Sequence, residues 1–298
     1  MGGRYGHVVA LLGRGVGQVT GSHIPGAGRW LPAAVVVAVL VCAGGNAVEA
    51  AGEDRTVVVT TSLLECAVSD VAGDSVRVRR LIPPRACPGH FDASPADLEA
   101  IAQATAFIRH DYQEYLDRRM TQAGKKARQY IAVRTAGAQT IPANYVALCR
   151  DLCDALTACF PAEADTFRRR SAGIERTVKE AAEEARGILA GSAGGVVVAA
   201  QQQREFCEWA GLRVASVFGD ADMSSLRGVE AAVASVRRAG AKAVVCNLQR
   251  GVREGEALAA KAGVPAVILT NFPVATEGGY RAMLLDNARA ISAGLRRE

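Results

Sequence analysis

The chain contains the stretch Cys87-Pro88-Gly89-His90-Phe91-Asp92-Ala93-Ser94-Pro95 between a strand-like run, residues 76–82, and a helix-like segment, residues 96–104. The thiol of Cys87 and the imidazole of His90 therefore lie three residues apart on a turn that follows a predicted strand. Ligands of open α/β sheets bind at the C-terminal ends of the strands. Thiolate and imidazole are also ligands that zinc-like divalent metals prefer. The stretch therefore predicts a βα unit and a candidate metal site.

The same alternation of strands and helices continues on both sides of this turn. The strand-like runs are residues 55–61, 76–82, 106–109 and 130–133, then 196–200, 213–218, 243–247 and 266–269. Strands that alternate with helices indicate parallel sheets. A long, highly charged helical segment separates the two series. The expected fold class is α/β, with two parallel-sheet βα lobes joined by one long helix and a ligand cleft between the lobes.

These patterns divide the chain into four parts. We expect a leader at residues 1–50, an N-terminal lobe at 51–163, the linking helix at 164–192 and a C-terminal lobe at 193–298. Each lobe is long enough to bury a core of its own.

The leader has the order of a secretory signal. Arginines precede an apolar run at residues 31–42, and Val48-Glu49-Ala50 offers a cleavage site before Ala51. The run has about a dozen residues, fewer than the roughly 20 that span a bilayer. A tilted membrane anchor is one alternative, and a lipid on Cys42 is another, although the preceding residues lack the expected small side chain. We therefore expect an exported protein, either periplasmic or extracellular and membrane-associated.

Composition argues against several classes of function. The net charge is +5, and no Lys/Arg cluster carries interleaved aromatic residues, which gives nucleic-acid binding little support. The chain has no Gly-rich phosphate loop, G-x-S-x-G motif or plausible Ser-His-Asp set, so we expect no enzyme. The eight Cys include no C-x-x-C pair, and their disulfide pairing cannot be deduced from sequence.

The order of the motifs resembles that of the metal-binding solute-binding proteins of ABC importers, the zinc/manganese group. The motifs that carry the resemblance are Thr60-Thr61-Ser62, residues 88–98, the single long helix, Trp209-Ala210-Gly211-Leu212 and residues 279–287. The resemblance extends from Thr56 to about Leu295. It implies that two lobes hold a divalent metal ion, most simply zinc, with little hinge bending. It also implies a monomer that delivers this cargo to an ABC permease and its ATPase.

The resemblance also implies site residues. His90 falls on the family's first metal-ligand His, whereas carboxamides stand near the other ligand positions. Cys87 and His90 are therefore the expected metal ligands, and the expected cleft residues are Asn144, Gln201, Gln202, Asn247 and Asn271. Neutral amide oxygens are weak zinc ligands, for which the thiolate of Cys87 could compensate. Cys66, after the first strand, is a further candidate for the same cleft.

Several alternatives stay open. The chain resembles a divergent branch that carries Cys-Pro-Gly-His and Asn271-Phe272-Pro273, whose cargo the sequence does not identify. Asn and Gln can also meet a metal chelate or a small organic solute, and the chain could be an interaction protein with a degenerate site. His110 ends the third strand, and we expect it at the surface, with lining of the cleft as the alternative.

Overall fold

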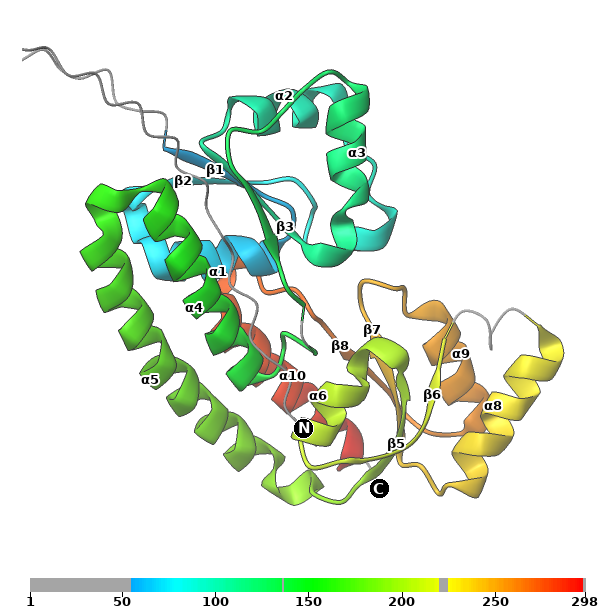
Figure 1. The fold of residues 1–298 in the computed structure, drawn as a ribbon. Helices are drawn as coiled ribbons and strands as arrows, with labels where there is room; N and C mark the ends of the chain where they lie inside the picture. Colours follow the sequence, from blue (N-terminus) through cyan, green and yellow to red (C-terminus); the bar gives the residue numbers. More distant parts are fainter. Residues whose placement is uncertain (1–54, 136, 220–224, 297–298) are drawn as a thin grey trace, which may run out of the picture. The chain divides into compact units, whose positions relative to one another are not determined.

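The computed structural model describes residues 55–135, 137–219 and 225–296, and these residues belong to one compact unit. The expected leader, its cleavage site and Cys42 lie outside the described residues. Two four-stranded parallel sheets, each covered by helices, make up the fold (Figure 1). This confirms the expected α/β class. In the described ranges, none of the helices combines the length and apolarity needed to span a bilayer.

The N-terminal lobe is built on a sheet of strand order β2-β1-β3-β4. Its strands are β1 (Thr56–Val59), β2 (Arg77–Arg80), β3 (Ala106–His110) and β4 (Tyr130–Val133), and its helices are α1 (Ser62–Ala72), α2 (Pro95–Gln103), α3 (Tyr115–Gln122) and α4 (Pro142–Cys159). All five residues of β3 are buried, as a central strand of a parallel sheet requires. Helix α2 begins where Ser94 and Asp97 form a capping box.

The C-terminal lobe repeats this plan with the strand order β6-β5-β7-β8. Its strands are β5 (Val196–Ala200), β6 (Arg213–Phe218), β7 (Ala243–Asn247) and β8 (Ala266–Leu269), and its helices are α6 (Arg204–Trp209), α8 (Leu226–Arg238), α9 (Arg253–Ala262) and α10 (Gly279–Leu295). Because the strands are parallel, their C-terminal ends lie at one edge of each sheet. Several of them are followed there by loops and short 3₁₀ turns.

The lobes are joined by α5 (Ala164–Leu189), an uninterrupted helix of 26 residues. Its buried side chains lie on one face, and they are Phe167, Ile174, Val178, Ala181, Ala182, Ala185 and Leu189. That face packs against α1 and α4 of the first lobe and against α10 of the second. The linking helix is therefore fastened to both lobes along its length.

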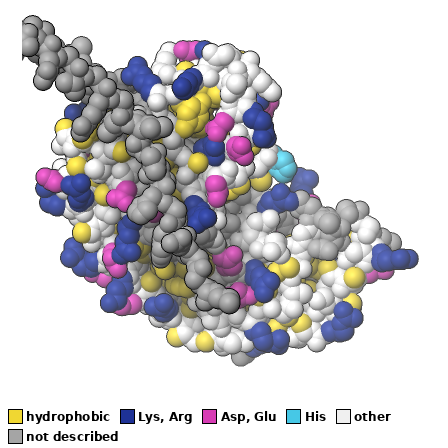
Figure 2. Space-filling view, in the orientation of Figure 1, with side chains coloured by type: hydrophobic (Ala, Val, Ile, Leu, Met, Phe, Trp, Pro, Cys, Tyr) yellow, Lys and Arg dark blue, Asp and Glu magenta, His cyan; other side chains and the backbone are white. Residues whose placement is uncertain are grey.

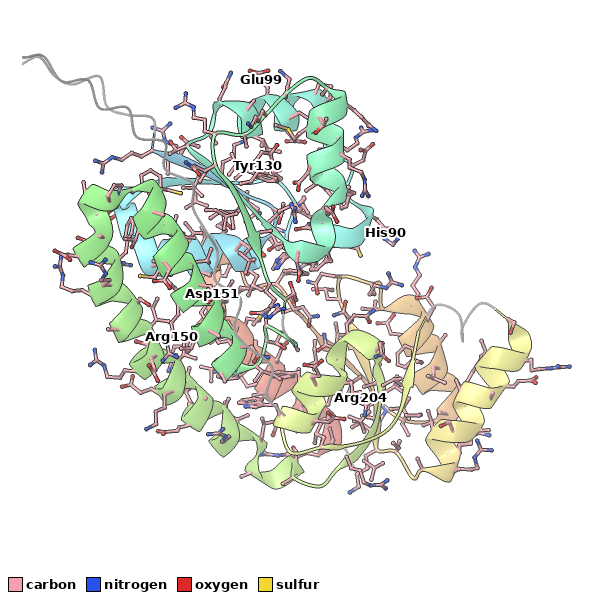
Figure 3. All side chains as sticks on the ribbon, in the orientation of Figure 1. His90, Glu99, Tyr130, Arg150, Asp151 and Arg204 are labelled. Atoms are coloured by element: carbon pink, nitrogen blue, oxygen red, sulfur yellow. The ribbon has the colours of Figure 1, made fainter. Side chains whose placement is uncertain are left out.

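Charged side chains of both signs are spread over the visible surface (Figure 2). Arg150 and Asp151 of α4 and Arg204 of α6 point outward from their helices (Figure 3). The Arg150 guanidinium pairs with Glu175 at 2.5 Å and so joins α4 to α5. Exposed ion pairs of this kind contribute little stability, so the packing of apolar side chains holds the fold.

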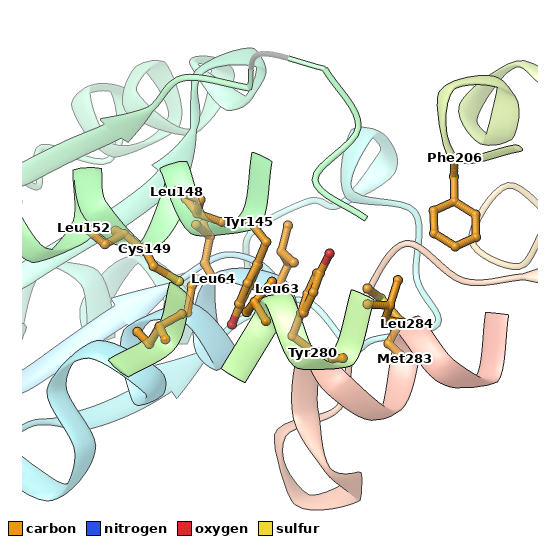
Figure 4. Packing of buried hydrophobic residues seen from close by; sticks show 14 of the residues in the cluster. Leu63, Leu64, Tyr145, Leu148, Cys149, Leu152, Phe206, Tyr280, Met283 and Leu284 are labelled. Carbon is orange, nitrogen blue, oxygen red and sulfur yellow. The ribbon is translucent and has the colours of Figure 1, made fainter. Parts of the chain in front are cut away.

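One buried apolar cluster runs through both lobes (Figure 4). The Tyr145 ring of α4 stacks on the Tyr280 ring of α10, with centroids 3.8 Å apart and planes inclined by 9°. Tyr280 also donates a hydrogen bond from its hydroxyl to the Thr140 carbonyl oxygen at 2.7 Å. The C-terminal helix thus completes the core of the N-terminal lobe. Separate clusters fill the opposite faces of the two sheets.

Candidate functional site

A cavity of about 300 Å³ lies where the strands of both sheets end. The first lobe contributes Leu63 and the segments after β3 and β4, and the second contributes the segments after β5 and β8. The lining residues are Leu63, His110, Tyr112, Thr135, Gly137, Ala138, Gln139, Thr140, Gln201, Gln202, Glu205, Asn271 and Phe272. The C-terminal ends of parallel strands are the usual ligand-binding edge of such sheets. This cavity is the candidate functional site.

His110 forms part of the cavity wall, and only 2% of its surface is exposed. Its Nε2 is 3.0 Å from the Thr61 hydroxyl, and its Nδ1 is 3.3 Å from the Thr135 hydroxyl. Burial lowers the pKa of His110 to about 4, so the imidazole is neutral near pH 7. The expectation that His110 lies at the surface is wrong, because β3 is a central strand and its last residue is enclosed by the following loops.

Tyr112 forms an aromatic surface beside His110. Its ring stacks on the imidazole, with centroids 5.1 Å apart and planes inclined by 8°. Half of the Tyr112 side chain, 51%, is nevertheless exposed. The ring is therefore rigidly supported on one side and open to solvent on the other.

The turn that carries Cys87 and His90 packs beside this aromatic surface. The Tyr115 hydroxyl donates to the carbonyl oxygens of Pro88 at 3.2 Å and of Phe91 at 2.9 Å. Partial burial raises the pKa of Tyr115, and Asp92 and Cys87 add to the effect, which places the Cys87 thiol near the phenol. Burial also raises the pKa of the lining residue Tyr112, and Cys87 adds to this effect, so the turn is fixed against α3 close to the cavity.

The loop after β4 is held by both lobes. Glu205 of α6 accepts a hydrogen bond from the Ala138 amide at 2.7 Å, and Asn144 of α4 donates to the Ala138 carbonyl oxygen at 2.9 Å. Gly137 has a φ of +75°, and a Cβ there would lie 2.9 Å from the Glu205 carboxylate and 3.0 Å from Asn144 Nδ2. Glycine permits both the backbone conformation and the close approach.

Two polar atoms of this loop lack a hydrogen-bond partner within the described part of the chain. They are Gln139 Oε1 and Thr140 Oγ1, and both residues line the cavity. Thr140 is 1% exposed. Buried polar atoms are nearly always paired, so these two are exceptions. Both have almost no accessible surface, so the loop itself encloses them and neither is open to the cavity.

The second lobe supplies carboxamides to the cavity. The Asn271 side-chain oxygen accepts from Gln203 Nε2 at 2.9 Å, and its backbone amide donates to the Gln249 side-chain oxygen at 3.1 Å. Gln249 also donates to the Pro84 carbonyl oxygen at 2.9 Å, which is a further hydrogen bond between the lobes. The exposed side chains of Gln201 and Gln202 are left to face a ligand.

The structure brings three of the seven predicted site residues to the cavity lining, namely Gln201, Gln202 and Asn271. Asn144 supports the loop instead. Asn247 is 2% exposed, and its side-chain oxygen accepts from the Arg250 amide at 2.9 Å, closing the turn after β7.

The two predicted metal ligands lie outside the lining. Cys87 is half-buried and His90 is exposed at the end of its turn (Figure 3). Their roles as metal ligands stay predictions. Within the described ranges, no group of three or more His, Cys, Asp or Glu residues is close enough to hold a metal ion.

The other described thiols are removed from this cavity. Cys66 lines a different cavity of about 500 Å³, between α1, α5 and the start of α10, so the expectation that it reaches the same cleft is wrong. All seven described Cys are free thiols. Burial raises the pKa of Cys66, Cys207 and Cys246 to about 12, which keeps them protonated and unreactive.

Sequence reasoning missed Glu205, Tyr112, Gln139 and Thr140 in the cavity wall. All four lie in loops or at the start of a short helix, and tertiary packing decides where they point. The sequence did contain one signal for these cavity residues, because each lies in the segment that follows a predicted strand.

Comparisons with known proteins agree with this architecture. The family model described as "ZnuA: Zinc-uptake complex component A periplasmic" matches residues 57–294. A search of the curated proteins gives no match.

Several solved structures share the fold. A crystal structure of ZnuA matches with a TM-score of 0.70 and 15% identity over 81% of this chain and 99% of that chain. The periplasmic zinc binding protein TroA from Treponema pallidum matches with a TM-score of 0.69 and 17% identity over 82% and 100%. The Mn-bound periplasmic metal binding protein from Candidatus Liberibacter asiaticus matches with a TM-score of 0.66 and 14% identity over 81% and 99%. At these identities, the likeness shows the fold.

Proposed function

The chain belongs to the family of periplasmic zinc-uptake components, and from this premise we propose that it is the extracytoplasmic solute-binding component of an ABC importer. It captures a divalent metal in the cavity between its lobes and delivers it to the permease and ATPase of that importer. One observation carries the proposal beyond the family match. The strand ends of both lobes enclose a single cavity, and Glu205 and Gln249 join the lobes across it.

Zinc is the proposed metal, and Cys87 and His90 are its proposed protein ligands. Thiolate and imidazole suit zinc better than manganese, which prefers oxygen ligands. The turn that bears them packs against Tyr115 and lies near Tyr112 of the cavity wall. A metal bound there would lie at the margin of the cavity.

The decisive experiment begins with elemental analysis and native mass spectrometry of the purified mature protein. Zinc is then titrated into the wild type, His90→Ala and Cys87→Ser. Cys159→Ser is the matched control, because Cys159 is a half-buried free thiol at the end of α4. We expect the first two substitutions to weaken zinc binding and the control to leave it unchanged. Zinc binding that survives His90→Ala would refute the site, and failure to bind any divalent metal would refute the function.

Export is the second part of the proposal. The mature protein begins near Ala51, and it acts as a monomer in the periplasm or on the outer side of a membrane. Cell fractionation with mass spectrometry of the mature N-terminus tests this. A cytoplasmic protein that still begins at Met1 would contradict it.

A further inference from the structure

We infer that the cargo enters as an uncharged chelate, in which a small amino-carboxylate molecule already coordinates the metal. This inference rests on the proposed function, because it presumes that a divalent metal is the cargo. It assigns the cavity residues to the organic part of the complex.

The size of the cavity is the first observation. At about 300 Å³ it lies at the lower end of the range for small-molecule sites, which is roughly 300–1,000 Å³. A bare ion bound directly by side chains needs these groups to converge within about 2.0–2.3 Å of one point. The space present here suits a molecule of about the size of an amino-acid chelate.

The hydrogen-bonding groups are the second observation. The side chains of Gln201 and Gln202 are exposed and belong to the cavity lining. Each carboxamide offers hydrogen-bond donors and an acceptor. An amino-carboxylate chelate matches this set, because its metal-bound amines keep N–H donors and its carboxylates accept.

The charge of the wall is the third observation. Glu205 is the one charged side chain among the described lining residues, and its carboxylate already accepts from Ala138. His110 is neutral, because burial lowers its pKa to about 4. An anionic complex such as zinc citrate would meet no cationic group in this wall, so burying its charge there would cost free energy. An uncharged chelate avoids this desolvation cost.

The aromatic surface is the fourth observation. Tyr112 is stacked on His110 and half-exposed, and Phe272 lies in the same lining. Flat apolar faces of this kind contact the carbon skeleton or the imidazole ring of an organic ligand. A hydrated ion would gain nothing from them.

The test uses the purified mature protein and isothermal titration with four probes: zinc alone, L-histidine alone, zinc with a small excess of L-histidine, and zinc citrate. If the protein takes the chelate, histidine should raise the apparent affinity for zinc about tenfold or more. Native mass spectrometry should then find protein, zinc and histidine in one complex. If the protein takes only the free ion, histidine competes for the metal and must lower the apparent affinity.

Gln202→Met is the site variant, because it removes the exposed carboxamide and keeps the length of the side chain. We expect a loss of about fivefold in affinity for the zinc–histidine complex, as for one hydrogen bond. Gln122→Met is the matched control, because Gln122 is also exposed but lies on α3 outside the cavity lining. It should bind as the wild type does.

The outcomes separate the two proposals. Tight binding of zinc alone, weakened by histidine, overturns the chelate and leaves the proposed function intact. Equal binding of histidine with and without zinc, or tighter binding of zinc citrate, also overturns this inference. Failure of all forms of zinc and of other divalent metals overturns the proposed function, and the chelate with it.

Discussion

At the scale of single residues, His110 should make the stability of the protein depend on pH. Its pKa is about 4 in the folded state, below the ordinary value of 6.5. The unfolded chain therefore binds a proton that the folded chain does not, between these two values. The free energy of unfolding should fall by up to about 3 kcal/mol as the pH is lowered from about 6.5 to about 4, and this contribution should then level off.

Urea unfolding at a series of pH values measures this effect. The difference between the wild type and His110→Gln isolates it from the titration of carboxylates. His90→Gln is the control, because His90 is exposed. Parallel pH profiles for the wild type and His110→Gln would show that His110 is not the cause.

A side chain at Gly137 should weaken both the fold and cargo binding. A Cβ there would push on Glu205 and Asn144, the two side chains that hold the loop after β4. Gly124 is a matched control, since its φ of +65° is equally left-handed and a Cβ at that position would have nothing within 4 Å. Both Ala substitutions cost about 1–2 kcal/mol of backbone strain. Gly137→Ala should cost about 1 kcal/mol more and weaken cargo binding severalfold, because it also disturbs two hydrogen bonds.

Chemical unfolding and zinc titration of Gly137→Ala and Gly124→Ala measure these effects. If both variants lose the same stability and bind zinc as the wild type does, the contacts around Gly137 contribute neither to stability nor to binding.

The sequence predicted where the site lies better than it predicted which residues line it. Gln201, Gln202 and Asn271 were found through the resemblance to the solute-binding family, whose ligand positions lie after the strands. Thr140 and Glu205 were missed because loop packing, which no local pattern encodes, places them at the cavity.

At the scale of elements, the packing of α9 on β7 depends on Gly255. A Cβ at this position would overlap the Cys246 sulfur and lie 3.1 Å from the Phe218 ring. Gly255→Ala should therefore destabilise the protein by about 1–3 kcal/mol through overpacking, although alanine is the better helix former. Gly187→Ala is the control in α5, where nothing lies within 4 Å, and it should stabilise by about 0.4–1 kcal/mol.

Thermal and chemical unfolding of the two variants settle the comparison. A neutral or stabilising Gly255→Ala would mean that α9 can move away from the sheet at little cost.

The elements themselves follow largely from local sequence. The predicted strands and the long helix are present, because apolar runs and charged helical periodicity are local properties. Helix α4 likewise begins at Pro142, since proline favours the first turn of a helix.

At the scale of the whole molecule, cargo binding should produce little hinge motion. Helix α5 passes unbroken between the lobes, and one apolar cluster includes residues from both. Domain closure needs a few residues that absorb large backbone changes, and this core opposes such changes. Small-angle X-ray scattering with and without the zinc chelate, or with zinc alone, should give the same radius of gyration. A clear compaction on binding would contradict this rigid linkage.

The stacking of Tyr280 on Tyr145 also constrains when the chain can fold. Helix α10 lies more than a hundred residues beyond the first lobe, yet it fills part of that lobe's core. Contacts between such distant segments form late and slow the folding of a chain. Because the N-terminus of the chain emerges first, the core of the first lobe cannot be completed until residue 280 has emerged as well. During the proposed export through a narrow channel, the first lobe would therefore remain loose, and both lobes would consolidate together on the far side.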